Sequence, residues 1–501
     1  MDITTIEHYL SIEASHQLHQ TTLPSPSAIQ AASSSLPSPS SPTYLDSHSP
    51  SATISHITND ILPALTGQSR SGRYFGFVTG GVQPIAEWAD NIVSRVDQNV
   101  QVHLPDQTVA TEVEDAALRM LAGVLRLEEG DWRGRTFTTG ATASNVLGLA
   151  CGRETIIGRR IPDGEGTVGD LGLLRACRLA GIDDVQVLTS AGHSSLSKAS
   201  SIVGLGRGSV IQLPLSSEEP WKLDLNAVEE HLQRPGVASI IAVSIGEVNT
   251  GRFAVQGLED MQRLRALADK YGAWIHIDGA FGIFARALEK TQEFETLHKR
   301  VEGVELADSI TVDGHKLLNV PYDCGVFFTR TASTLQSVFA NPNAAYLSSS
   351  AQATIPSPLN IGIENSRRWR ALPAYAVLLT EGRPGIARSL ARMTRLSRGV
   401  ARYLGKSEHY DLLPSGAGAQ EDEIFMIVLF RARRKETNEV LVEKINDTRE
   451  MYISGTSWQG EKAARVAVSS WKVDPEQDLK VVEAVLTTVA EGKSFDIAAV
   501  A

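Results

Sequence analysis

The sequence has few cysteines and no long apolar run. Its three cysteines, Cys151, Cys177 and Cys324, form no CxxC pair and are odd in number, so they indicate neither a disulfide framework nor a metal site. No run approaches the roughly 18 apolar residues that a membrane-spanning helix needs. The N-terminal residues MDITTIEHYLSIEASHQ carry early acids and no apolar stretch, which argues against a secretory signal. We therefore expect a cytoplasmic protein without a membrane partner.

An excess of positive charge is also missing. The chain has 47 Lys and Arg against 58 Asp and Glu, a net charge of -11, and an acidic surface repels nucleic acid and anionic lipid. No GxGxxG or GxxxxGK[ST] motif follows the first predicted strand, which disfavours a nucleotide-binding protein. What is present is 501 residues, 42% of them hydrophobic, enough for one large and one smaller domain.

Seven short β-rich runs alternate with helical patterns in the middle of the chain, and several of them are continuously apolar. Continuous apolar runs are expected of strands that are covered on both faces. Their alternation with helices predicts an α/β fold with a mostly parallel seven-stranded sheet. The predicted strands are 135–139, 185–190, 209–213, 238–245, 273–278, 309–312 and 324–329.

The two ends of the chain differ from this middle part. Residues 1–54 form an N-terminal segment whose Ser/Pro-rich stretch is expected to be a flexible linker or extended arm, because it cannot bury enough apolar surface. Residues 55–110 are predicted to be a helical segment, 111–370 a large domain and 371–501 a small α+β domain. The small domain's predicted elements are helices 371–380, 385–404, 439–449 and 475–490 and strands 423–430 and 464–468.

Two segments at predicted strand ends carry the groups of greatest chemical interest. DGHKLLN places Lys316 in a turn, where a desolvated amine becomes a nucleophile toward an aldehyde; alternatively it is an ordinary surface lysine. His315 beside it is a candidate phosphate or carboxylate ligand, or a structural histidine. WIHIDGAFG ends a strand with Asp278, which needs a partner such as a pyridinium N–H, unless it caps a helix or pairs with an arginine. Ala280 is small enough to pack against a flat ring.

Two further strand ends lead into predicted helices. In TFTTGATASNVLGLACGRE the helix begins near Ala143, so Thr142, Ala143 and Ser144 can offer N–H and hydroxyl donors to a phosphate, or simply cap the helix. In SAGHSSLSKAS, His193 can stack on a ring opposite Ala280, or cap the following helix.

With these segments in view, the chain resembles the group II pyridoxal-phosphate (PLP)-dependent amino-acid decarboxylases, which include aromatic-L-amino-acid and glutamate decarboxylases. The similarity runs from about Arg73 to the last helix and is most specific in TGATASN, AGHSS, IHIDGAFG and DGHKLLNVPYDCG. It implies fold type I, pyridoxal 5'-phosphate as cofactor, an amino-acid substrate, a large PLP-binding domain, and a homodimer with a shared active site, in which residues 55–110 are the dimerisation segment.

The resemblance also implies roles for single residues. Lys316 resembles the Schiff-base lysine, Asp278 the partner of the pyridine nitrogen, and His193 the histidine stacked on the ring. Ala143, Ser144 and His315 fall where the family binds phosphate.

Two more residues match the family at positions that local patterns do not single out. Tyr346 aligns with the mobile-loop tyrosine that protonates the substrate carbon, and is otherwise an ordinary loop residue. Arg367 lies where the family has an arginine near the active site, which makes it a candidate substrate ligand.

The sequence departs from the family pattern at three places. Val248 replaces a threonine near the cofactor, so Asn249 is the candidate for the hydrogen bond to the ring hydroxyl. Leu317 replaces a tryptophan, and Asp313 stands where an asparagine is common. These departures bear on the substrate and on the reaction.

The implied reaction is decarboxylation of an L-amino acid to an amine and CO2, through an external aldimine and a quinonoid. The alternatives are aldehyde synthesis, carbon–carbon lyase or other amino-acid chemistry, and a PLP-binding scaffold without catalysis.

Overall fold

The computed structural model describes residues 22–341, 355–415 and 420–499, and its larger sheet has seven strands. Their order is β1-β7-β6-β5-β4-β2-β3, with β7 antiparallel to both neighbours and the remaining pairs parallel. The predicted α/β fold and its mostly parallel sheet are confirmed. The strands are β1 (Gly134–Thr138), β2 (Asp184–Thr189), β3 (Val210–Gln212), β4 (Val237–Ser244), β5 (Trp274–Asp278), β6 (Ser309–Asp313) and β7 (Gly325–Thr329).

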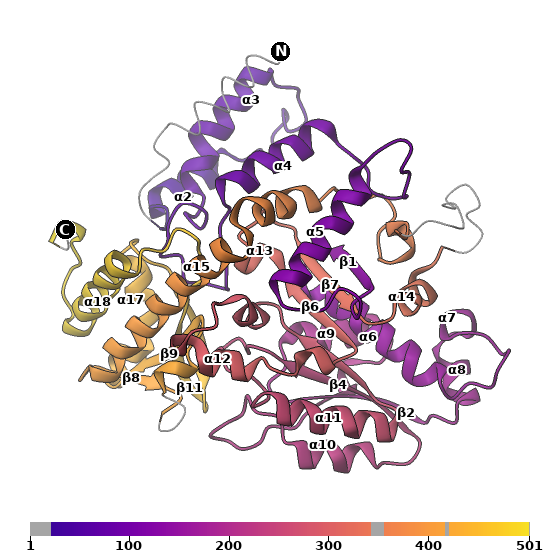
Figure 1. The fold of residues 1–501 in the computed structure, drawn as a ribbon. Coiled ribbons are helices and arrows are strands. Elements are labelled where there is room, and N and C mark those ends of the chain that lie inside the picture. Colours follow the sequence, from indigo (N-terminus) through magenta and orange to yellow (C-terminus); the bar gives the residue numbers. More distant parts are fainter. Residues whose placement is uncertain (1–21, 342–354, 416–419, 500–501) are drawn as a thin grey trace.

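Helices cover both faces of this sheet. Successive residues of a strand point to opposite faces, so each strand contributes side chains to two hydrophobic layers. Along β5, Ile275 and Ile277 belong to one hydrophobic cluster and Trp274 to another. Figure 1 shows α10 and α11 side by side below the sheet, where the two helices contact each other. No described helix has both the length and the apolarity to cross a bilayer. The helices of this part are α4 (Pro84–Val96), α5 (Ala110–Val124), α6 (Ala141–Gly158), α7 (Val168–Leu171), α8 (Leu173–Leu179), α9 (Ser194–Ile202), α10 (Leu225–Leu232), α11 (Leu258–Tyr271), α12 (Glu295–Arg300), α13 (Gly314–Leu317) and α14 (Ala332–Phe339).

The C-terminal part has a four-stranded antiparallel sheet in the order β10-β11-β9-β8. Gln459 and Gly460 both have positive φ, which matches the tight hairpin between β10 and β11. Gly382, with φ 56°, breaks α15 between the two helices predicted there. The elements are α15 (Ala371–Lys406), β8 (Tyr410–Leu413), β9 (Ile427–Ala432), α16 (Lys435–Glu439), α17 (Leu441–Asp447), β10 (Ser454–Trp458), β11 (Glu461–Ala467) and α18 (Pro475–Glu491).

The Ser/Pro-rich stretch differs from its prediction as a flexible linker or extended arm. It contains two helices, α2 (Pro26–Ser35) and α3 (Pro50–His56), each with proline in the first turn. Ser25 and Ser49 cap them by accepting a backbone N–H, so the Ser-Pro pairs act as helix starts. The Thr22 N–H donates to the carbonyl of Arg449 at 2.8 Å, which ties the stretch to the C-terminal part.

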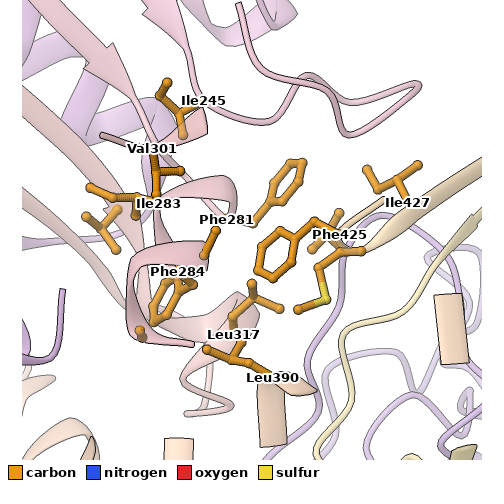
Figure 2. Close-up of a cluster of buried hydrophobic side chains, with 14 of the residues drawn as sticks. Ile245, Phe281, Ile283, Phe284, Val301, Leu317, Leu390, Phe425 and Ile427 are labelled. Carbon is orange, nitrogen blue, oxygen red and sulfur yellow. The ribbon is translucent and has the colours of Figure 1, made fainter. Parts of the chain in front are cut away.

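One hydrophobic cluster joins the two sheets. Figure 2 shows Phe281 and Phe284, which follow β5, near Leu317 of α13, with Phe425 and Ile427 from the C-terminal part beside them. All five side chains are buried. Because close-packed interiors resist displacement, this cluster gives the segments after β5 and β6 a rigid support.

Candidate active site

A cavity of about 230 Å³ lies where strands of the large sheet end. The segments that follow β1, β2, β4, β5 and β6 all contribute to its wall, as expected where the carboxyl ends of strands in an α/β sheet face one edge. Most of the predicted site residues meet here. The lining residues are Thr139, Gly140, Ala141, Thr142, Ala143, His193, Ser195, Ser244, Gly246, Glu247, Val248, Asp278, Ala280, Phe281, Asp313, His315 and Lys316.

Lys316 lies on α13, directly after β6. Its Nζ is 3.1 Å from Oδ2 of Asp313 and 5.6 Å from the centre of the Phe281 ring. Asp313 precedes Lys316 by three residues, so one helical turn brings both side chains to the same face. The amine is therefore held at the cavity wall by a buried carboxylate and an aromatic ring.

Asp278 is the last residue of β5, and two amides hold its carboxylate. The Nδ2 of Asn145 donates to Oδ2 at 3.1 Å, and the N–H of Ala280 donates to Oδ1 at 3.4 Å. A carboxylate accepts about four hydrogen bonds, so capacity remains on the cavity side. Both donors are neutral, and a cationic N–H in the cavity would complete the charge balance.

The N-terminus of α6 forms another wall, made by Gly140, Ala141, Thr142 and Ala143. The first amides of a helix have no partner within it, and the helix dipole favours an anion there. Gly140 has φ 152°, and a Cβ on it would lie 3.1 Å from Cε1 of His315. A glycine therefore keeps this corner open between the helix and the imidazole.

The two histidines of the wall are held as neutral rings. The N–H of Ser195 donates to Nδ1 of His193 at 3.1 Å, so this residue both caps α9 and lines the cavity. The N–H of Cys324 donates to Nδ1 of His315 at 3.3 Å, and the Tyr322 ring lies 4.6 Å from that imidazole. Burial lowers the pKa of both His193 and His315. Each ring therefore has Nε2–H as its donor.

Two predicted cofactor ligands do not reach the cavity. The Ser144 hydroxyl lies 2.7 Å from Oγ1 of Thr138 and donates to the Val326 carbonyl at 3.1 Å, inside the helix–sheet interface. The Oδ1 of Asn249 accepts the Thr456 hydroxyl at 2.7 Å, which turns it toward the C-terminal sheet. The predicted roles of Ser144 in phosphate binding and of Asn249 at the ring hydroxyl are corrected accordingly.

Arg367 is also placed elsewhere. Its guanidinium is paired with Glu114 of α5, with NH1 3.1 Å from Oε2 and a second contact from NH2 to Oε1. Both side chains are buried, so Arg367 joins α5 to the segment before α15 and does not face the cavity. This corrects its prediction as a substrate ligand. Tyr346, the predicted proton donor, lies outside the described residues.

Several polar residues at the site were not assigned from the sequence. Asn145 lies within the apolar run of α6, and His276 within that of β5; a polar residue inside a buried run was the available signal. Glu247 is buried at the wall, accepts the Asn249 N–H at 2.9 Å, and has its pKa raised by burial. Arg465 of β11 reaches the Val248 carbonyl from the C-terminal sheet. No clear sequence pattern identifies these last two.

The comparisons with known proteins agree with this geometry. The pyridoxal-dependent decarboxylase conserved domain matches residues 54–433. The chain belongs to the pyridoxal-dependent decarboxylase family. The predicted family is confirmed, together with pyridoxal 5'-phosphate as its cofactor and carboxy-lyases as its members.

Relatives of this decarboxylase family match different shares of the chain. An L-2,4-diaminobutyrate decarboxylase of Acinetobacter baumannii is 27% identical over 57% of this chain, and the match spans 54% of that relative, about half its length. Tryptophan decarboxylase 1 of Oryza sativa subsp. japonica is 24% identical over 83% of this chain and 80% of its own.

Solved structures show the same fold. Oryza sativa TDC with PLP and tryptamine has a TM-score of 0.80 at 20% identity, covering 99% of both chains. Rhodiola rosea 4-hydroxyphenylacetaldehyde synthase has a TM-score of 0.78 at 17% identity, covering 99% of this chain and 100% of the other. The predicted type I fold is thus confirmed.

The residues at the cavity fit the cofactor of this family. The start of α6 and the Nε2–H of His315 suit a phosphate, and the glycine at position 140 keeps that corner open. Asp278 offers an acceptor for a ring N–H, and Lys316 an amine for an aldehyde. Asp313 is the exception, because its Oδ1 accepts the Ala141 N–H at 2.6 Å and so places a carboxylate beside the phosphate corner.

Proposed function

We propose that the protein decarboxylates an L-amino acid to the corresponding amine and CO2, with pyridoxal 5'-phosphate as cofactor. One observation carries this proposal. The Lys316 amine, the Asp278 carboxylate and the N-terminus of α6 line one cavity, although they come from three separate segments of the chain. This is the donor set that a phosphorylated pyridine aldehyde requires, in a chain of the decarboxylase family.

Each residue has a distinct part in the proposed reaction. Thr142, Ala143 and His315 would hold the phosphate, while Ala280 and His193 would flank the ring. When bound, PLP supplies an electron sink for the carbon that loses CO2. Asp278 would keep the ring nitrogen protonated, and Lys316 would bind the aldehyde and later release the product. Together these contacts orient the substrate and exclude water from its α-carbon.

A proton must then be delivered to the α-carbon. We propose Tyr346 as its donor, on the resemblance alone. Among the described residues, we propose His193 as a second candidate donor, because it lines the cavity and its Nδ1 is occupied by the Ser195 N–H, which leaves Nε2–H free to donate.

The charges of the wall bear on the substrate. Three acidic residues, Glu247, Asp278 and Asp313, line the cavity with a single lysine, and no arginine is among the described lining residues. The cofactor's phosphate adds further negative charge. An acidic side chain on the substrate would meet repulsion here, so we propose an amino acid with a neutral, including aromatic, or cationic side chain.

The proposal is tested by reconstituting the protein with PLP and screening the common amino acids by mass analysis of the products. Amine and CO2 are the expected products. Aldehyde with peroxide would instead indicate aldehyde synthesis, and a keto acid would indicate transamination. Lys316→Arg should abolish both turnover and the visible absorbance of the lysine-bound cofactor. Lys270→Arg, on the exposed side of α11, is the matched control and should retain both.

We also propose that the protein is a cytoplasmic homodimer with a shared active site. Apolar side chains around α4 support the dimer: Trp88 is 60% exposed and Phe77 is 61% exposed. Contiguous exposed apolar patches mark interaction surfaces, and we propose that these two side chains belong to one. Light scattering should give the mass of a dimer for the unmodified protein and that of a monomer for Trp88→Glu. A monomeric mass for the unmodified protein would contradict the dimer.

A further inference from the structure

A chain of buried hydrogen bonds runs behind Asp278, on the side away from the cavity. The Trp274 indole N–H donates to Oγ of Ser309 at 2.9 Å, and Ser309 Oγ lies 2.8 Å from Nδ1 of His276. The His276 Nε2 lies 3.0 Å from Oδ1 of Asn145, whose Nδ2 donates to Asp278. The chain thus links two strands of the sheet to α6 and ends on the carboxylate.

Only one arrangement of protons satisfies this chain. Since a carboxylate only accepts, the amide nitrogen of Asn145 must face Asp278 and its oxygen must face His276. The imidazole therefore carries its proton on Nε2 and accepts the Ser309 hydroxyl at Nδ1. The Thr311 hydroxyl also donates to the Asn145 oxygen, at 2.8 Å, so the amide cannot rotate without losing two donors.

The packing around His276 keeps the ring neutral and in place. Its side chain is fully buried, and burial lowers the pKa of His276. Gly148 of α6 faces the ring, and a Cβ there would lie 2.3 Å from Cε1 of His276. A glycine at this position is what lets α6 approach the ring closely enough for Asn145 to bridge to Asp278.

We propose that Asn145 and His276 are positioning residues that hold the Asp278 carboxylate in the orientation needed to bind the cofactor's ring nitrogen. Asn145 fixes one carboxylate oxygen, and His276 fixes Asn145. The inference rests on the proposed function, because orienting Asp278 matters for binding only if a ring nitrogen of the cofactor faces its carboxylate. If Asn145 and His276 served only to pack the protein interior, their loss would weaken the fold but would not depend on which atom the cofactor carries at the ring-nitrogen position.

The test compares the affinities of the cofactor-free protein for PLP and for 1-deaza-PLP, in which carbon replaces the ring nitrogen. Asn145→Ala should weaken PLP binding about tenfold or more, the usual effect of losing a hydrogen bond to a charged group, and change deaza-PLP binding less than about threefold. His276→Phe keeps a ring in the same space and should weaken PLP binding in the same selective way, to a smaller extent. It also serves if Asn145→Ala does not fold.

Ser200→Ala is the matched control, a buried serine of α9 that hydrogen-bonds Gly206 and Ser209 outside the cavity. It should change neither affinity. Equal losses for PLP and deaza-PLP in the Asn145 and His276 variants would reduce the chain to packing and overturn the inference, as would no loss at all. If the unmodified protein binds both compounds equally, the proposed role of Asp278 fails, and the inference fails with it.

Discussion

Replacing Arg367 by methionine should destabilise the fold and leave the cavity intact. Arg367 and Glu114 form a buried ion pair in which the side chains are only 2% and 5% exposed. The pair spans 253 positions of the sequence and connects α5 to the segment before α15. The Arg367 N–H also donates to Oδ1 of Asn99 at 3.2 Å, so the residue anchors a third segment.

The magnitude follows from what the substitution leaves behind. Methionine fills much of the arginine volume but leaves the Glu114 carboxylate buried without its partner. Removing one member of a buried ion pair costs about 3–5 kcal/mol, because the remaining charge is desolvated and unpaired. Replacing both members by apolar residues of similar size is close to neutral or stabilising. Arg367→Met combined with Glu114→Leu should therefore recover most of the loss.

The assay is urea unfolding of the PLP-loaded protein, run on the unmodified chain, both single variants and the double variant. The expected ranking places the double variant close to the unmodified chain and both single variants well below it. The PLP affinity and KM of folded Arg367→Met should stay unchanged. If this variant instead keeps its stability and raises KM for the amino acid, Arg367 is a substrate ligand and its structural assignment is refuted. Additive losses in the double variant would also refute the ion-pair argument.

Three further predictions concern the site. Asp313→Asn should tighten PLP binding by about tenfold, because it removes a carboxylate from the corner where the phosphate is expected. Absorbance titration measures the PLP affinity, and weaker binding by the variant would contradict the prediction. Gly148→Ala should lower the melting temperature, since its methyl group would collide with His276 at a cost of about 1–3 kcal/mol; an unchanged value would show that α6 can yield. Acidification should destabilise the fold through His276: burial lowers its pKa from 6.5, so the unfolded chain binds the extra proton, and stability present at pH 7 is lost as the pH falls below 6.5. His276→Phe should flatten this part of the pH profile by at most about 1.4 kcal/mol per pH unit, and an identical profile would exclude the assignment.

The large sheet could be predicted because several of its strands, such as β4 and β7, are nearly continuous apolar runs. Their burial on both faces leaves a strong signal in the sequence. The C-terminal sheet was predicted only in part, since β10 (Ser454–Trp458) is small and polar and β8 (Tyr410–Leu413) is a short edge strand. Both form by pairing with neighbouring strands, so their structure depends on partners that local patterns do not reveal. The Ser-Pro pairs at Ser25 and Ser49 are typical helix starts, but the low apolar content of the surrounding stretch favours an unfolded segment.

The site residues that could be predicted are those placed by local sequence, and the ones that could not are placed by contacts with distant parts of the chain. Lys316, Asp278 and Thr142 could be placed together because each lies at or just after the carboxyl end of a strand, and these ends meet at one edge of an α/β sheet. Arg367 and Asn249 could not, because their side chains are directed by Glu114 and by Thr456 from distant parts of the chain. A motif specifies which groups are available, while long-range partners decide which way they point.

The turn that carries Lys316 shows how far this dependence extends. Asn319, with φ 55°, directs its Nδ2 to the carbonyls of Gly80 at 2.7 Å, Lys316 at 2.9 Å and Ser469 at 2.9 Å. A Cβ on Gly80 would lie only 1.9 Å from the Lys316 carbonyl oxygen, so the segment around Gly80 packs in direct contact with the turn. The position of the amine is therefore set jointly by residues before the large sheet and after the small one. A polar side chain in a left-handed backbone conformation, within three residues of the lysine, binds these three segments into one unit.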